Sequence, residues 1–363
     1  AKALTIKPKD IEIYINLGGL FFQQQQWQQA INSYQNALAI NPNVAVVYRN
    51  LARLYKQIGK SELVLQCWEK ALELEPAKAK VPEHCNLGKT FFEQGKIEKA
   101  IACYHRAISL QPDYPPAYLD LATILIKQEQ YQEAIDCYRQ VIKLEPYYWQ
   151  AYYSLANIYQ RQNKLEDAVA LYGRTLKLNP NCVGAYVKSA QILLDLQEWE
   201  TAVQCCQKAI ALKSDNWKAF SYLGTALLQQ KKYPEAIEVC RQSLELNPES
   251  LSSYRNLAEA LVNTKNWSEA ILIYQQILQK KPDCPEIHYK LGQVAIEQKQ
   301  WETAEAAFKQ AISLNPDNSW AYHHLGMVLC ELGKYPAAIP ILKRASQLNP
   351  NFAWSYFHLG DAL

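Results

Sequence analysis

Apolar and small residues recur along this chain in a pattern 34 residues long. One copy of the pattern contains Tyr118, Leu121 and Ala122, followed by Ala134 and Tyr138. Residues three and four positions apart lie on one face of a helix, so each copy predicts two amphipathic helices. The small residues allow the two helices to approach closely, and the aromatic side chains fill the space beside them.

A proline closes nearly every copy, because proline cannot continue the second helix and favours the turn into the next copy. Successive prolines lie 34 residues apart with one step of 36, and Ser214 stands where one is missing. The prolines are Pro8, Pro42, Pro76, Pro112, Pro146, Pro180, Pro248, Pro282, Pro316 and Pro350. This period is typical of a solenoid, in which each copy buries its apolar face against its neighbours.

The pattern predicts one elongated domain of ten repeats. Their ranges are 11–44, 45–80, 81–114, 115–148, 149–182, 183–216, 217–250, 251–284, 285–318 and 319–352. Residues 1–10 fit the end of a preceding repeat, and residues 353–363 fit the start of an eleventh. Both ends fall inside a repeat, so we expect the chain to be a piece of a longer protein.

The order aromatic-x-x-Leu-Gly/Ala, then Ala-x-x-x-aromatic, then Pro resembles the tetratricopeptide repeat family over essentially the whole chain. The resemblance implies an all-α fold, a right-handed superhelical α-solenoid of antiparallel helix pairs. It also implies that positions 2, 5, 6, 9, 12 and 13 of each first helix line an inner, concave wall. Residues at these positions are therefore the candidates for binding.

Composition and motifs exclude several classes of function. A net charge of +3 over 363 residues does not favour nucleic acid as a partner. No segment is apolar enough to span a membrane and no secretory signal precedes the first repeat, so we expect a soluble, cytoplasmic protein. The ten cysteines include no Cys-x-x-Cys pair and fit reduced packing residues. Without a nucleophile–base set, a phosphate loop or paired carboxylates, we predict no enzyme activity and no cofactor.

Charge is distributed unevenly over the inner-wall positions: repeats two to seven are mainly basic, and later repeats are mainly acidic. The spacing of Arg49, Arg53 and Lys56 places them on one stripe of a helix, as needed to receive a carboxylate or phosphate. An ordinary solvated basic face is the alternative interpretation. With residues of the flanking helices, these form the predicted basic/asparagine patch: Asn16, Arg49, Asn50, Arg53, Lys56, Asn86 and Lys89.

A second predicted patch combines aromatic side chains with histidines. Trp320 and His324 repeat in the next unit as Trp354 and His358, and an exposed pair of tryptophans suggests a binding surface. The alternative is that a following segment of chain covers them. The two histidines lack a matching carboxylate or thiolate, so we predict no metal site. The aromatic/histidine patch comprises Tyr289, Trp320, His323, His324, Trp354, Phe357 and His358.

The leading prediction is a protein–protein interaction scaffold that binds an extended or helical peptide, with an acidic segment at the basic/asparagine patch. One alternative is the substrate-selecting or regulatory arm of a larger enzyme. Asn16, Asn50 and Asn86 form part of a ladder similar to that of O-linked N-acetylglucosamine transferases, a class of glycosyltransferase. The other alternative is self-association through the exposed ends of the solenoid.

Overall fold

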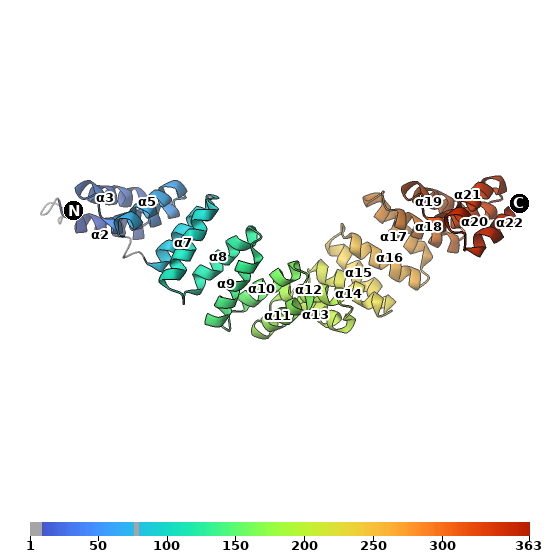
Figure 1. The fold of residues 1–363 in the computed structure, drawn as a ribbon, viewed down its shortest axis with the longest axis horizontal. Coiled ribbons are helices and arrows are strands. Elements are labelled where there is room, and N and C mark those ends of the chain that lie inside the picture. The colour runs from blue at the N-terminus through green and yellow to red at the C-terminus, as the bar shows by residue number, and fades with distance from the viewer. Residues whose placement is uncertain (1–8, 76–79) are drawn as a thin grey trace. The chain divides into compact units, whose positions relative to one another are not determined.

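The computed structural model describes residues 9–75 and 80–363, and the regular structure in these ranges is entirely α-helical (Figure 1). The first helices of the successive pairs are α2 (Ile11–Gln23), α4 (Ala45–Gln57), α6 (Val81–Glu93), α8 (Pro115–Lys127), α10 (Trp149–Arg161), α12 (Val183–Asp195), α14 (Trp217–Gln229), α16 (Leu251–Asn263), α18 (Pro285–Glu297), α20 (Ser319–Glu331) and α22 (Ala353–Ala362). The second helices are α3 (Trp27–Ile40), α5 (Ser61–Leu74), α7 (Ile97–Leu110), α9 (Tyr131–Leu144), α11 (Leu165–Leu178), α13 (Trp199–Leu212), α15 (Tyr233–Leu246), α17 (Trp267–Lys280), α19 (Trp301–Leu314) and α21 (Tyr335–Leu348). The predicted all-α fold of packed helix pairs is confirmed.

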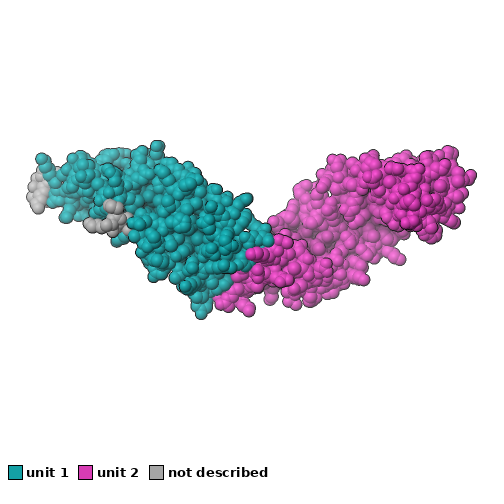
Figure 2. Space-filling view, viewed as in Figure 1, with its two compact units in different colours: residues 1–162 teal, residues 163–363 magenta. Residues whose placement is uncertain are grey.

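The chain divides into two compact units, residues 1–162 and 163–363, which Figure 2 shows in different colours. Unit 1 contains α2 to α10 and unit 2 contains α11 to α22. The boundary therefore falls inside the range 149–182, which the sequence predicts as one repeat. Residues 1–8 of the predicted preceding repeat lie outside the described residues.

A small residue on the first helix faces a large one on the second, and this contact sets how closely the pair packs. In α18, a Cβ atom built on Gly292 would lie 2.6 Å from the ring of Phe308 in α19. Gly18 and Tyr34 meet in the same way in unit 1, at 2.5 Å. Such distances are shorter than any real Cβ contact, so only glycine fits where the ring approaches this closely.

The turn inside each pair depends on one residue with left-handed backbone geometry. Three of these residues are glycines, Gly59, Gly95 and Gly333, with φ between 69° and 75°. Seven others carry side chains and have φ between 55° and 61°: Gln25, Glu129, Asn163, Gln197, Lys231, Lys265 and Lys299. The turn is therefore fixed by the packing of the two helices rather than by glycine at every copy.

The turn between pairs starts from an extended residue directly before the proline, as proline requires of its neighbour. At three of these turns, the side chain near the start of the next first helix bonds to a carbonyl of the turn. The Tyr118 hydroxyl donates to the Pro112 carbonyl at 3.0 Å, and the His288 ring lies 2.9 Å from the Pro282 carbonyl. A histidine can therefore replace tyrosine at this position because both reach the same carbonyl.

The missing proline does not change the backbone of its turn. Lys213, which precedes Ser214, is extended, with φ −147° and ψ 96°. Asn247, which precedes a proline, has φ −142° and ψ 91°. Helix packing on both sides therefore holds this geometry without the ring.

Candidate functional site

The basic/asparagine patch lies on α2, α4 and α6 of unit 1, and part of it is open to solvent. Arg53 and Lys56 are exposed on α4, and Asn16 is exposed on α2. Within residues 9–75 and 80–162, no carboxylate forms an ion pair with Arg53 or Lys56. These two cations are therefore accessible to a ligand.

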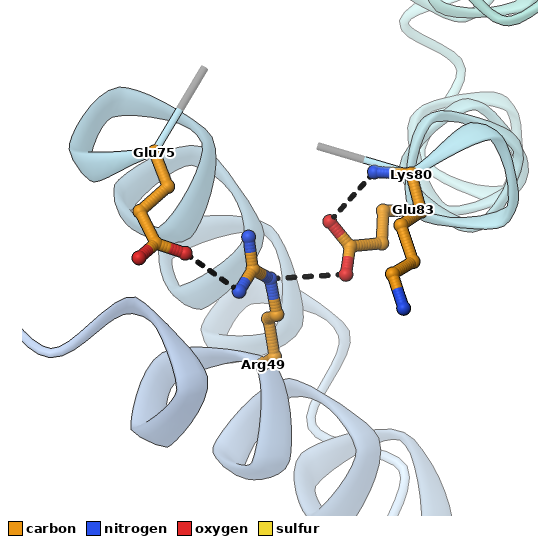
Figure 3. Close-up of polar contacts among 4 residues, drawn as sticks. All are labelled: Arg49, Glu75, Lys80 and Glu83. Atoms are coloured by element: carbon orange, nitrogen blue, oxygen red, sulfur yellow. Dashed lines mark hydrogen bonds and ion pairs between the residues drawn. The ribbon is translucent and has the colours of Figure 1, made fainter. Parts of the chain in front are cut away.

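Arg49, in contrast, is held by the protein's own carboxylates (Figure 3). Its Nη1 lies 2.9 Å from Oε2 of Glu75, and its Nε lies 3.0 Å from Oε1 of Glu83. The other carboxylate oxygen of Glu83 accepts a hydrogen bond from the Lys80 backbone N–H at 3.3 Å. The Arg49 side chain is only 14% exposed. The predicted three-cation stripe is thus corrected to two, because Arg49 joins α4 to the end of α5 and the start of α6.

Lys89 and the two inner asparagines are also partly engaged. Lys89 Nζ lies 3.2 Å from Oδ2 of Asp120 on α8. Burial raises the pKa of the Asp120 carboxyl, while the Lys89 ammonium opposes that rise. Asn50 and Asn86 are half-buried. The exposed residues of the patch without an ion-pair partner in the described part of unit 1 are therefore Asn16, Arg53 and Lys56, while Lys89 is exposed but paired.

The aromatic/histidine patch lies on α18, α20 and α22 of unit 2 and exposes three large rings. Trp320 is 47% exposed, Trp354 is 59% exposed and Phe357 is 57% exposed. The Trp320 ring packs against Phe352 with a centroid distance of 4.4 Å, and Trp354 packs edge-on against Phe357 at 5.7 Å. Each tryptophan is thus held on one side and open to solvent on the other.

His323 is a correction to this patch, because its ring lies in the interior. It is 6% exposed, and its Nδ1 lies 3.3 Å from the Ser355 hydroxyl. Burial, together with the nearby His324 and His358, lowers the pKa of His323 to about 4. His323 is therefore a neutral packing residue between α20 and α22, without access to a ligand.

His324 and Tyr289 form the base beneath the exposed rings. His324 Nδ1 lies 2.8 Å from the Trp320 carbonyl, which fits an Nδ1–H donor. Its ring packs edge-on against Tyr289 at 5.6 Å and lies 5.5 Å from Phe308. Burial lowers the pKa of His324, so it stays neutral near pH 7. His358 lies 3.8 Å from Asp361, a weak ion pair at most.

A pocket of about 350 Å³ in unit 2 was not among the predicted sites. We call it the α16–α18 pocket, and it is lined by Glu259 and Val262 of α16, Trp267 and Tyr274 of α17, and Lys290, Gln293, Val294 and Glu297 of α18. Glu259, Lys290 and Glu297 stand at inner-wall positions, so their positions in the repeat carried a signal. Their positions in the repeat indicated an acidic part of the inner wall but did not indicate a pocket there.

Asn256 of α16 stands at the repeat position equivalent to Asn16, Asn50 and Asn86, and its side chain is engaged within unit 2. The Asn256 amide donates to the Thr225 hydroxyl at 2.7 Å and to the Ser221 carbonyl at 3.3 Å. Its amide is therefore used to join α16 to α14.

In residues 9–75 and 80–363, no helix has both the length and the apolar character to cross a membrane.

Comparison with known proteins identifies the repeat. The family profile for the C-terminal ARM domain of tetratricopeptide repeat protein 21 matches residues 61–253. A tetratricopeptide repeat profile matches residues 227–294 and 295–363, and a TPR repeat profile matches residues 18–59. No curated protein matches the sequence.

Solved structures include helical arrays of similar fold. The C-terminal part of a TPR repeat-containing protein from Cytophaga hutchinsonii aligns with a TM-score of 0.59 and 18% identity, covering 67% of this chain and 99% of that one. YrrB, described as a TPR protein with an unusual peptide-binding site, aligns with a TM-score of 0.47 and 22% identity over 51% of this chain and 96% of its own. The repeat pattern, the helix pairs and the profile that covers more than half of the sequence agree, and this chain belongs to the tetratricopeptide repeat family.

Proposed function

We propose that this chain binds an extended or helical segment of a partner protein on the faces of its first helices, and that it has no catalytic activity of its own. The observation that carries the proposal is the exposure of Trp320, Trp354 and Phe357 on adjacent first helices of unit 2. Exposed aromatic side chains of this size commonly mark interaction surfaces. We further propose that the protein acts in the cytoplasm without a cofactor or nucleic acid.

The size of the rings indicates what they contribute. Half of an aromatic side chain is about 100 Å² of surface, so covering it with a partner is worth about 2.5 kcal/mol. That is the magnitude of a binding hot spot, whereas an exposed ion pair contributes about 0–1 kcal/mol. The aromatic/histidine patch would therefore supply most of the affinity.

The accessible cations of unit 1 have a different role in the proposal. Arg53 and Lys56 are exposed without an internal carboxylate partner in the described part of that unit, which favours an acidic segment of the partner. Charges of this kind mainly increase the rate of encounter and the selectivity. The alternative function, an arm that selects substrates for a glycosyltransferase, stays a prediction from the partial asparagine ladder.

The test is a pull-down with three double variants of the chain. Trp320→Ala/Trp354→Ala should lose the partner. Arg53→Ala/Lys56→Ala should weaken its capture at low salt, and the difference from the wild type should shrink as salt is raised. The control Leu272→Ala/Tyr335→Ala removes comparably exposed side chains from second helices and should retain the partner. Equal capture by the tryptophan variant and the wild type would refute the proposed role of the aromatic/histidine patch.

A further inference from the structure

The α16–α18 pocket contains two carboxylates that no cation neutralises in the described part of unit 2. Glu259 and Glu297 are exposed at its rim, and neither forms an ion pair within the described part of unit 2. The cation in the lining, Lys290, is directed elsewhere, since its Nζ lies 3.2 Å from Glu286. The pocket therefore presents uncompensated negative charge.

A tyrosine in the wall of the same pocket carries a hydroxyl that has no partner in the described part of unit 2. Tyr274 is 3% exposed, and among residues 163–363 its hydroxyl has no hydrogen bond to another group. Burial raises the pKa of Tyr274, and the negative charges of Glu259 and Glu286 raise it further, so the phenol stays protonated. Its oxygen can accept a hydrogen bond from an N–H donor that enters the pocket.

The remaining walls suit a side chain that is apolar along its stem and charged at its end. Val262 and Val294 offer apolar surface to methylene groups, and the Trp267 ring can interact with a cation through its π face. A hollow of about 350 Å³ accommodates one long side chain. In residues 9–75 and 80–363, no three histidine, cysteine, aspartate or glutamate residues gather as metal ligands, which favours an organic cation over a metal ion.

We propose that the α16–α18 pocket binds a basic side chain, lysine or arginine, of the partner polypeptide. Glu259 and Glu297 attract the charge, the Tyr274 hydroxyl accepts one N–H, and Trp267 packs against the cation. The identity of the ligand as part of a polypeptide rests on the proposed function. The preference for a cation rests on the pocket alone.

The test uses small probes, so that it does not depend on finding the partner. Nα-acetyl-lysinamide, Nα-acetyl-argininamide and the uncharged isostere Nα-acetyl-citrullinamide are titrated into the intact chain by saturation-transfer NMR. The cationic probes should bind about tenfold more tightly than citrulline, the sum expected for partly exposed charge pairs and one cation–π contact. The variant Glu259→Gln/Glu297→Gln should abolish this preference.

Two further variants distinguish binding in the pocket from a general effect of negative charge and from loss of folding. Glu235→Gln/Glu245→Gln removes two exposed carboxylates from α15, away from the pocket, and should leave the preference unchanged. Tyr274→Phe removes only the unpartnered hydroxyl and should weaken the cationic probes a few-fold while the chain stays folded. Equal binding of all probes, absence of binding, or an unchanged preference in Glu259→Gln/Glu297→Gln would overturn the inference. These outcomes are independent of the tryptophan pull-down, so the two proposals can fail separately.

Discussion

Replacing Gly292 by alanine should destabilise unit 2, even though alanine is the better helix former. The added Cβ would lie 2.6, 2.7 and 2.8 Å from three ring atoms of Phe308. The shortest of these is about 0.8 Å closer than the 3.4 Å at which ordinary contact begins. The ring is fully buried and packs against Tyr289 and His324, so it cannot move aside freely.

A matched substitution elsewhere in unit 2 separates the two opposing effects. Gly173 lies inside α11, and a Cβ built on it would meet no atom within 4 Å. Gly173→Ala should therefore gain only the helix-propensity difference, about 0.5–1 kcal/mol. Gly292→Ala gains the same amount but loses about 1–3 kcal/mol to overpacking, which leaves a net loss of about 1 kcal/mol.

Hydrogen exchange followed by mass spectrometry is the suitable assay, because a repeat array opens locally and need not unfold in two states. Gly292→Ala should exchange several-fold faster in α18 and α19, whereas Gly173→Ala should exchange more slowly in α11. The difference between the two variants isolates the packing contribution, since both gain the same helix propensity. Equal stabilisation by both substitutions would refute the argument that the ring position is fixed.

Three other changes test the remaining contacts. Arg49→Met should destabilise the α4–α6 region by about 3–5 kcal/mol, because it leaves the buried Glu83 carboxylate without a cation. Hydrogen exchange in α4 and α6 should become faster, and adding Glu83→Gln should reverse this increase. Since the pKa of His323 lies near 4 in the fold and near 6.5 when unfolded, protonation favours the unfolded state below pH 6.5, and stability should fall by about 2 kcal/mol by pH 5. His323→Gln should flatten that profile in pH-dependent unfolding. The hydroxyls of Ser243 and Ser253 lie 2.8 Å apart and fully buried, so alanine at either should cost about 1 kcal/mol and the double variant less than the sum in a double-mutant cycle.

The fold could be predicted from the sequence because its information is local and repeated. The contact between a small residue and a ring, as in Gly292 and Phe308, spans 16 positions and recurs in most copies, with Cys206, Cys240 and Leu342 in place of the ring. The prolines and the helical period of apolar residues independently predict the same boundaries between repeats. The bond from the Tyr118 hydroxyl to the Pro112 carbonyl was not predicted, although both residues belong to the repeat pattern. Pattern shows that a residue recurs but not which polar atom it reaches.

The candidate site could be predicted only in part, because accessibility depends on contacts between distant positions. Arg49 has the spacing of a binding stripe, yet its partners Glu75 and Glu83 lie 26 and 34 residues further along the chain. His323 shares a helix face with exposed residues, but a neighbouring serine and an aromatic ring enclose it. Inner-wall position thus identified candidate residues without distinguishing side chains that are engaged within the protein from those that are accessible.

The candidate binding residues of this chain lie where the repeat pattern permits variation. The small and bulky positions that hold each helix pair together are filled in a similar way in most copies, so they cannot distinguish one ligand from another. The residues at the inner-wall positions of the first helices differ from copy to copy. They are basic in α4, acidic in α16 and α18, and aromatic in α20 and α22. Under the proposed function, a partner therefore needs complementary side chains at several positions rather than one motif. Since each exposed contact is worth only about 0–3 kcal/mol, the proposed binding would draw its specificity from several contacts rather than from one.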